Sequence, residues 1–222
     1  MGGLAPTERD GTAGRGDACG VTSAADCASF ARMDPAQRRA TYADLLQVPD
    51  RFIAEILDGE LLTAPRPAFP HARAALVIIQ DLSPFDRPRS DADEPGGWWF
   101  LFEPELHLGA DILVPDIAAW RHENMPPAKN LAYTDRAPDW ICEVVSPSTG
   151  RTDRVRKTPI YARERVGHVW LVDPLQRTLE VYRRQESGWL VVGSHGDVEH
   201  VHAEPFETLE IDISRWWLEH AE

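Results

Sequence analysis

The chain has 222 residues, 43% of them hydrophobic and eight of them tryptophan, which is enough to bury the core of one globular domain. No apolar run approaches the ~20 residues of a membrane-spanning helix, and residues 1–17 lack the basic and apolar segments of a secretory signal. The net charge of −13 argues against broad non-specific DNA binding. Three cysteines without a C-x-x-C pair favour reduced thiols and a cytoplasmic location.

Composition and apolar periodicity divide the chain into a disordered tail over residues 1–30 and a single domain over 31–222. The first half of the domain is expected to hold a helix over Met33–Leu46, a β-hairpin over Phe52–Ala64 and a helix over His71–Leu82. Five strands should follow, over Trp98–Phe102, Leu106–Leu108, Ile112–Val114, Ile117–Trp120 and Trp140–Ser146. The last part should hold a helix over Pro159–Val166, a strand over His168–Val172, a hairpin from Leu179–Tyr182 and Trp189–Val192, and a short strand over Leu209–Ile213. This order predicts a mixed sheet flanked by helices.

Two of these expectations depend on particular residues. Asp58-Gly59 stands between two apolar-rich runs and predicts a tight hairpin turn, because both turn positions need positive φ. Thr158-Pro159 fits the N-cap and first position of a helix, because a proline deep inside a helix removes a hydrogen bond. Asp153 and Lys157 would then lie in a preceding turn or in a kinked first segment.

Two carboxylates in apolar surroundings are the strongest functional signal. Asp116 follows Val114-Pro115, and Glu143 lies within the run Ile141–Val145. A carboxylate on such a run is costly to bury unless it is paired or binds a metal. On neighbouring strands Asp116 and Glu143, with the carbonyl of Val144, would suit Mg²⁺, which takes few protein carboxylates and keeps several waters. The alternative is that both acids pair with arginines at strand ends.

Lys157 and two further acids follow from the same hypothesis. The ammonium of Lys157 would orient or activate the attacking water, or neutralise developing negative charge. Asp153 would orient Lys157 or add a metal contact, and Glu60, after the hairpin turn, would reach the metal site as a supporting or bridging carboxylate. The alternatives are an exposed lysine, an ordinary i,i+4 ion pair and a solvated strand glutamate.

Substrate contacts are expected from His71 and from a basic run that includes Arg151 and Arg154. His71 opens a predicted helix and would contact a phosphate or a water, or would only end the preceding loop. The basic run is also typical of a solvated helix face. Other chemistries lack support, because the sequence has no phosphate-binding G-x-x-x-x-G-K-[ST], no G-x-G-x-x-G and no G-x-S-x-G, and His200 and His202 have no zinc-ligand partner at suitable spacing.

These residues together resemble a known family. The sequence contains E-I-L-D-G-E-L from Glu55, then His71, then Val114-Pro115-Asp116, then E-V-V-S-P-S-T from Glu143, followed by Asp153, Lys157, Tyr161 and V-W-L-V-D from Val169. This pattern is similar to the Uma family of restriction-endonuclease-like proteins, within the PD-(D/E)XK nuclease superfamily, over about residues 52–192. The resemblance implies a restriction-endonuclease-like α/β (α+β) fold, with a mixed sheet, flanking helices and an additional N-terminal β-hairpin.

The resemblance also implies a nuclease site that uses Mg²⁺, with Mn²⁺ as an alternative. Asp116 matches the aspartate of the family's P-D motif and Glu143 its acidic strand residue. The superfamily lysine usually stands two residues after that acid, where this chain has Val145. Lys157 is the natural substitute if its side chain reaches back over the sheet.

The first hypothesis is therefore a Mg²⁺-dependent endonuclease that hydrolyses DNA phosphodiester bonds. Because a double-strand cutter needs two sites, a homodimer is expected as well. The second hypothesis is a catalytically inactive module of the same fold that binds protein or nucleic acid. The third is a related enzyme that acts on RNA or a smaller phosphodiester.

Overall fold

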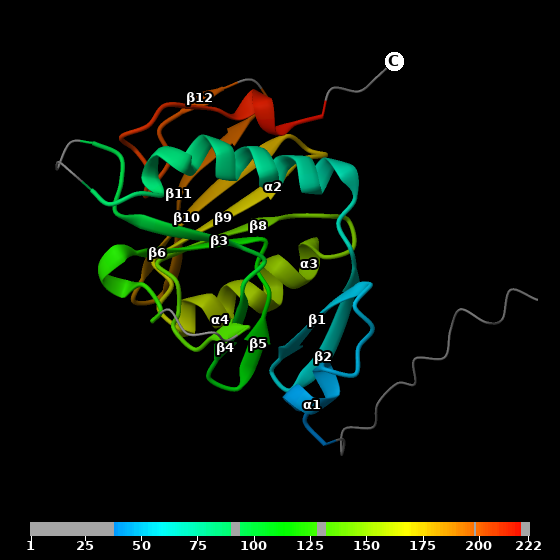
Figure 1. Ribbon diagram of the computed structural model, residues 1–222. Helices are drawn as coiled ribbons and strands as arrows, with labels where there is room; N and C mark the ends of the chain where they lie inside the picture. Colours follow the sequence, from blue (N-terminus) through cyan, green and yellow to red (C-terminus); the bar gives the residue numbers. More distant parts are fainter. Residues whose placement is uncertain (1–37, 90–93, 128–131, 198, 219–222) are drawn as a thin grey trace, which may run out of the picture. The chain divides into compact units, whose positions relative to one another are not determined.

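Two mixed β-sheets carry the fold, and helices cover them (Figure 1). The computed structural model describes residues 38–89, 94–127, 132–197 and 199–218, so the expected tail over 1–30 and the expected domain boundary lie outside the described residues. Residues 39–222 group as one compact unit. None of the helices in the described ranges is long and apolar enough to span a membrane.

The larger sheet has six strands in the order β11-β10-β9-β8-β6-β3. Its strands are β3 (Trp98–Phe102), β6 (Ile117–Arg121), β8 (Trp140–Val144), β9 (His168–Asp173), β10 (Thr178–Gln185) and β11 (Gly188–Gly196). Only β8 and β9 pair in parallel within this sheet, so the prediction of a mixed sheet is confirmed. The five residues of β8 are all buried, as expected for a strand covered on both faces.

The second sheet has five strands in the order β2-β1-β5-β4-β7. Its strands are β1 (Phe52–Leu57), β2 (Glu60–Pro65), β4 (Glu105–Leu108), β5 (Asp111–Leu113) and β7 (Tyr133–Thr134). The predicted hairpin is present as β1 and β2, and its turn residues Asp58 and Gly59 have φ of 54° and 86°. A side chain at Gly59 would also meet Arg39, whose Cγ lies 2.8 Å from the position of an added Cβ. A third, two-stranded sheet pairs β12 (His200–Val201) with β13 (Ile211–Asp212).

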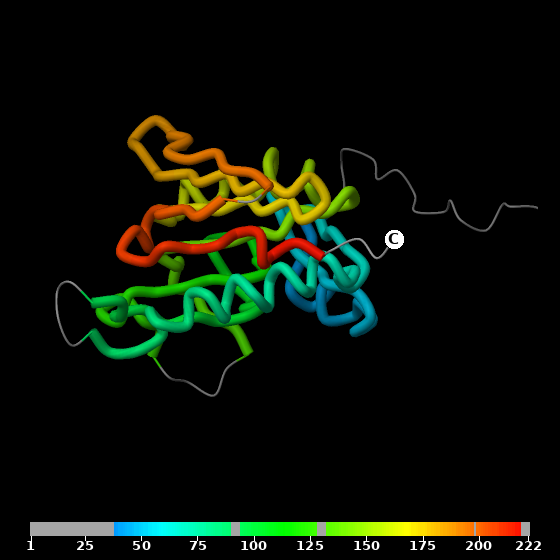
Figure 2. The backbone as a smooth tube through the Cα atoms, turned by 90° about the horizontal axis from the view of Figure 1, so that it is seen from above, coloured from blue at the N-terminus to red at the C-terminus, as the bar shows by residue number. Residues whose placement is uncertain are grey.

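Helices cover both faces of the six-stranded sheet, as Figures 1 and 2 show from two directions. The helical segments are α1 (Tyr42–Leu45), α2 (Phe69–Leu82), α3 (Gly150–Thr152), α4 (Thr158–Arg163), the π-helical turn η3 (Asp153–Lys157) and the 3-10 turns η1 (Ser83–Phe85), η2 (His122–Asn124) and η4 (Ile213–Trp216). On one face α2 and the C-terminal segment pack against Trp140 and Trp170. On the other face α4 and the five-stranded sheet pack against Ile141 and Val169.

Two helix predictions are wrong in their bounds. The first helix spans only Tyr42–Leu45 in the described part of the predicted range, because Thr41 is extended and caps it with Asp44. The later helix was expected over Pro159–Val166 with Thr158 as its N-cap, but helical backbone runs from Gly150 to Arg163, and Pro159 lies inside it. The π-helical turn just before Pro159 changes the hydrogen-bond pattern where the proline has no N–H to donate.

This π-helical turn positions two predicted site residues. Asp153 and Lys157 are its first and last residues, and both are buried. The side chain of Thr158 does not cap a helix but donates a hydrogen bond to the Arg154 carbonyl at 2.7 Å. Of the two alternatives for Asp153 and Lys157, the structure therefore has the distorted helical segment.

Candidate active site

Asp116 lies where the chain crosses from one sheet to the other. Val114 and Pro115 leave β5 of the five-stranded sheet, and Ile117 opens β6 of the six-stranded sheet. The Asp116 carboxylate accepts the Val144 backbone N–H at Oδ2 (2.7 Å), and His71 Nε2 lies 2.6 Å from Oδ1. These contacts connect Asp116 to β8 and to the first turn of α2, and they fix the position of the segment that joins β5 to β6.

Glu143 points from β8 into the same region and is 2% exposed. Its Oε1 accepts a hydrogen bond from the Tyr161 hydroxyl at 2.5 Å, and Lys157 Nζ lies 3.2 Å from Oε1 and 3.4 Å from Oε2. The side chain of Lys157 thus reaches back over the sheet to Glu143, which it must do if it is to replace the lysine that usually stands two residues after the acidic strand residue. Val145, which occupies the usual lysine position, packs into the apolar core instead.

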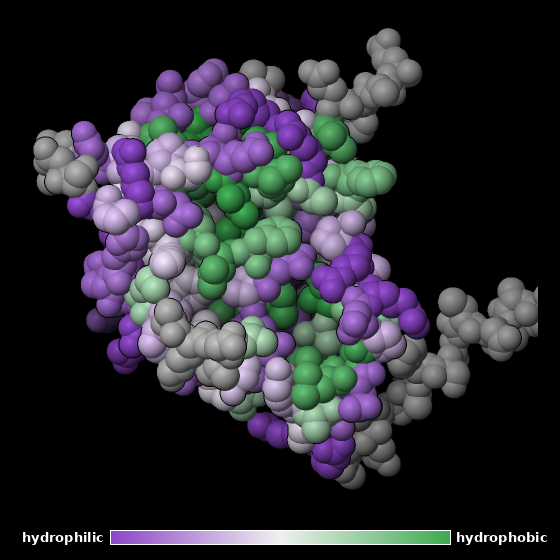
Figure 3. Space-filling view, viewed as in Figure 1, coloured by the Kyte–Doolittle hydropathy of each residue, from purple (hydrophilic) through white to green (hydrophobic). Residues whose placement is uncertain are grey.

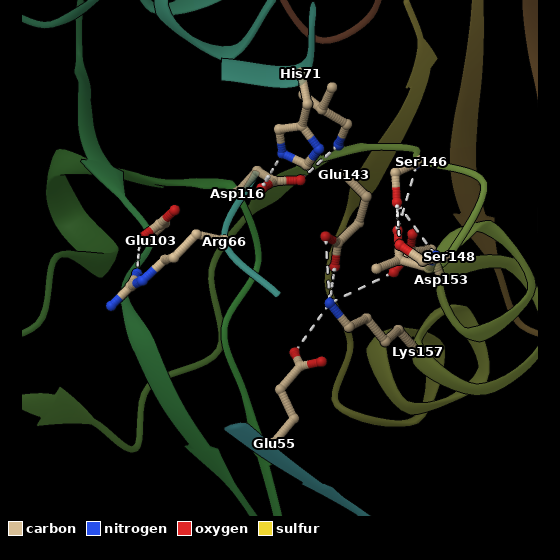
Figure 4. A network of polar contacts seen from close by, with 12 residues as sticks. Glu55, Arg66, His71, Glu103, Asp116, Glu143, Ser146, Ser148, Asp153 and Lys157 are labelled. Atoms are coloured by element: carbon tan, nitrogen blue, oxygen red, sulfur yellow. Dashed lines mark hydrogen bonds and ion pairs between the residues drawn. The ribbon is translucent and has the colours of Figure 1, made fainter. Parts of the chain in front are cut away.

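Three carboxylates surround the ammonium of Lys157, as Figure 4 shows. Besides Glu143, Glu55 Oε1 lies 2.9 Å and Asp153 Oδ1 lies 3.5 Å from Nζ. The same Glu55 oxygen accepts the backbone N–H of Val114 at 2.8 Å, two residues before Asp116. Glu55 therefore connects the hairpin, the lysine and the strand crossing.

This buried cluster holds more carboxylates than ammonium groups, and this imbalance affects the pKa values of Glu143, Asp153 and Lys157. Burial first, and then the neighbouring carboxylates, raise the pKa of Glu143 well above its usual value, although Lys157 opposes this. Burial likewise raises the pKa of Asp153. Burial alone would lower the pKa of Lys157, but Glu143 and Glu55 outweigh it, so its pKa is raised. Lys157 is therefore a charged donor and not a neutral base at physiological pH.

A pocket of about 250 Å³ gives access to these groups. Its lining includes the polar side chains Glu55, Arg66, His71, Asp116, Glu143, Ser146, Ser148, Thr149, Asp153 and Lys157. Arg66 stands at the rim, with its side chain 54% exposed, and contacts Glu103 at 3.3 Å (Figure 4). The pocket therefore combines buried acids with a basic group that solvent can reach.

Three residues predicted for the site lie outside this pocket. Glu60 is 62% exposed in its side chain and pairs with Arg156 at 2.7 Å. Its predicted place in the site is wrong because Glu60 sits at the turn end of β2, whereas Ala64 and Pro65 at the opposite end line the pocket. Arg154 lies 3.5 Å from Glu180, and Arg151 is exposed. A contact of either arginine with substrate would have to form beyond the pocket.

Glu55 and Arg66 are the charged pocket residues that were not predicted from the sequence. Glu55 had a usable signal, because it is a carboxylate inside the apolar run Phe52–Leu57, as Glu143 is in its own strand. Arg66 lies between two prolines in a connecting segment, and no pattern in the sequence marks it as a pocket residue.

The donor groups can be tested against a magnesium ion. No group of three or more His, Cys, Asp or Glu side chains in the described ranges has an arrangement that could hold a metal ion. An ion would therefore depend on fewer protein ligands and more water, which is the habit of Mg²⁺ and not of zinc or calcium. The oxygens of Asp116 and Glu143 are hard donors, and the buried excess of carboxylates favours an added cation. The residues therefore fit Mg²⁺.

The chain is thus an α+β protein with an acid–lysine cluster in one pocket. The sequence profile of the Uma2 family, described as "Putative restriction endonuclease", matches residues 40–214, and the chain belongs to this family. The resemblance seen in the sequence is thus confirmed. No curated protein matches the chain.

A solved structure supports the fold. It is described as a "putative nuclease belonging to DUF820" from Anabaena variabilis ATCC 29413 and is 20% identical to this chain. The match has a TM-score of 0.64 and covers 80% of this chain and 97% of the other. At this identity the likeness shows the fold alone, and it confirms the predicted α+β architecture.

Proposed function

We propose that this protein is a Mg²⁺-dependent endonuclease that hydrolyses DNA phosphodiester bonds, with Mn²⁺ as a substitute. The observation that carries the proposal is the burial of Asp116 and Glu143 beside a charged Lys157 in one pocket. Family membership supports a nuclease-like function. Asp116 and Glu143 would hold the ion, which would stabilise charge on the phosphate and lower the pKa of a bound water.

Each side chain of the cluster has a role in this proposal. The ammonium of Lys157, kept protonated by its three carboxylate neighbours, would stabilise negative charge that develops on the attacking water or on a phosphate oxygen. Because its pKa is raised, electrostatic assistance is favoured over proton abstraction by Lys157. Tyr161 and Lys157 fix the orientation of the Glu143 carboxylate through their contacts with its oxygens.

Substrate phosphates would approach from the rim of the pocket. The exposed guanidinium of Arg66 lies there, and the less exposed imidazole of His71 lines the pocket beside Asp116; we assign both to phosphate contacts. Glu55 and Asp153 act through Lys157 by holding its ammonium, so they are positioning residues. Glu60 has no part in this proposal.

One observation favours the second candidate, an inactive binding module. The oxygens of Glu143 already contact Lys157 and Tyr161, and those of Asp116 already contact His71 and the Val144 N–H. A module that keeps these pairs permanently would retain the fold without binding an ion.

Incubation with supercoiled plasmid DNA separates the two candidates. We expect nicked and linear products with Mg²⁺ or Mn²⁺ and none when EDTA removes the metal, because the carboxylates alone cannot neutralise phosphate charge. A labelled RNA assayed in parallel tests the substrate class. Intact DNA in both metals, with folded protein and at several salt concentrations, would contradict the proposal and favour the binding module.

A further inference from the structure

An open and apolar sheet edge lies next to the candidate site. β3 is the last strand of the six-stranded sheet and pairs only with β6 among the described strands. Its sequence, Trp-Trp-Phe-Leu-Phe, holds no charge, proline or glycine. An exposed apolar edge of this kind is a template for pairing with another strand, and proteins usually block it.

The other end strands of the two larger sheets, in the described part of the chain, carry such blocks. β11 contains three glycines and pairs with β10 across an irregular register at Val181/Tyr182. β2 has Glu60 at one end and Pro65 at the other, and β7 has only two residues. β3 is therefore the edge that is best suited to pairing.

Apolar side chains continue from the edge onto its surroundings. Trp99, Leu101 and Phe102 on β3 are 38%, 45% and 54% exposed, and Leu76 on α2 is 51% exposed. Figure 3 shows hydrophobic side chains gathered over α2 and β3 on this face. A groove of about 600 Å³ beside the strand is lined by the same three β3 residues together with Met125 and Tyr133.

The backbone of β3 is suited to pairing with itself. Gly97 O accepts from His122 N, and Glu103 N donates to Asp116 O, so the odd-numbered residues face β6. Because the two sides of a strand alternate, Trp98, Phe100 and Phe102 direct their backbone groups away from β6; the Trp98 carbonyl also lies 3.1 Å from His122 Nε2. An antiparallel pair centred on Phe100 would bond each of these residues to its counterpart in a second copy.

The charges at the two ends of β3 also suit a second copy. Glu103, which also contacts Arg66 at 3.3 Å, follows Phe102 directly, whereas Arg121 lies opposite Trp98 with its guanidinium 4.5 Å from the Trp98 ring centroid. Antiparallel pairing brings the acidic end of one strand to the basic end of the other. Parallel pairing would place like charges together.

We propose that two copies of this chain associate through their β3 strands and join their six-stranded sheets into one. The contact is isologous, because the same residues serve both copies. The dimer itself does not depend on the proposed function; only its consequence for the two candidate active sites rests on that function. Asp116 lies opposite Glu103 on the next strand inward from the paired edge. With a rise of ~3.4 Å per residue along a strand and ~4.8 Å between neighbouring strands, the two Asp116 residues of the dimer would lie roughly 25 Å apart. Two sites would then face the two strands of one duplex.

Sedimentation equilibrium of the full chain without DNA tests the surface. We expect the mass of two chains for the wild type. A Leu101→Lys/Phe102→Lys variant should raise the dimer dissociation constant at least about 30-fold, because charges at the edge oppose strand pairing. The matched control is Val191→Lys, a 53% exposed position on β11 at the opposite end of the sheet, which should leave the dimer intact.

Hydrogen exchange on the wild type gives a second test that needs no variant. The amides of Phe100 and Phe102 should exchange slowly in a dimer and fast in a monomer. A monomeric wild type, or a double variant that still dimerises, overturns the proposal, and capture of an unrelated extended peptide by a monomer would do the same. The mass does not depend on catalysis, so a dimer without nuclease activity would leave this surface standing while the proposed function fails.

Discussion

Asp116→Asn should lower the rate of Mg²⁺-dependent plasmid cleavage about a thousandfold, a loss of the size that removal of a key electrostatic group causes. The amide is nearly the same shape as the carboxylate and still offers an oxygen to the Val144 N–H, so the strand crossing should keep its position. What the variant loses is the negative charge that would hold the cation. Initial rates of nicking, measured at several Mg²⁺ concentrations, give the effect.

Glu60→Gln is the matched control for this variant. It removes one carboxylate from the same protein, but from a side chain that is exposed and paired with Arg156 outside the pocket. We expect its cleavage rate to stay within about twofold of the wild type, because screened surface pairs contribute little. Equal losses in both variants would mean that overall charge, and not a cation held by Asp116, supports cleavage.

Lys157→Met should destabilise the metal-free protein by about 3–5 kcal/mol near pH 8, because it leaves buried carboxylates without their cation. Glu55, Glu143 and Asp153 all have Lys157 as an ion-pair partner. Thermal unfolding in EDTA measures the change. Arg151→Met, at an exposed position two residues after Thr149 in the first turn of the same helical run, should stay within about 0.5 kcal/mol.

The destabilisation of Lys157→Met should depend on pH in a defined direction. Burial already raises the pKa of Glu143 and Asp153, and loss of the ammonium raises both further. The folded state then binds protons more tightly than the unfolded chain, so stability falls as the pH rises above the ordinary carboxyl range of ~4 and returns as the pH falls. In the wild type, the raised pKa of Lys157 contributes stability throughout neutral pH that is lost only in strong alkali. A variant with the same unfolding temperature as the wild type at pH 8 would contradict this account.

The sequence predicted Asp116 and Glu143 because burial of charge leaves a clear pattern. Asp116 and Glu143 each interrupt an apolar run, and the structure brings both into one pocket. The burial of all five residues of β8 also agrees with its apolar run. These are local patterns, and the residues that make them lie next to one another in the chain.

What the sequence could not give depends on contacts between distant segments. Glu55 and Glu60 are both hairpin glutamates, and their difference arises only when the N–H of Val114 and the ammonium of Lys157 meet Glu55. The helix that carries Lys157 begins at Gly150, because a π-helical turn accommodates Pro159, whereas the usual rule for proline predicts a start at Pro159. The distorted turn is also what directs both Asp153 and Lys157 inward.

Titration calorimetry with Mg²⁺ and Mn²⁺ tests the central claim most directly. The claim is that Asp116 and Glu143 hold one divalent ion beside the ammonium of Lys157. For folded wild-type protein we expect binding of one ion per chain, and we expect Asp116→Asn and Glu143→Gln each to weaken it by at least about 100-fold, or ~2.7 kcal/mol. Absence of uptake by the wild type, or equal uptake by both variants, would contradict the metal site and the nuclease mechanism built on it.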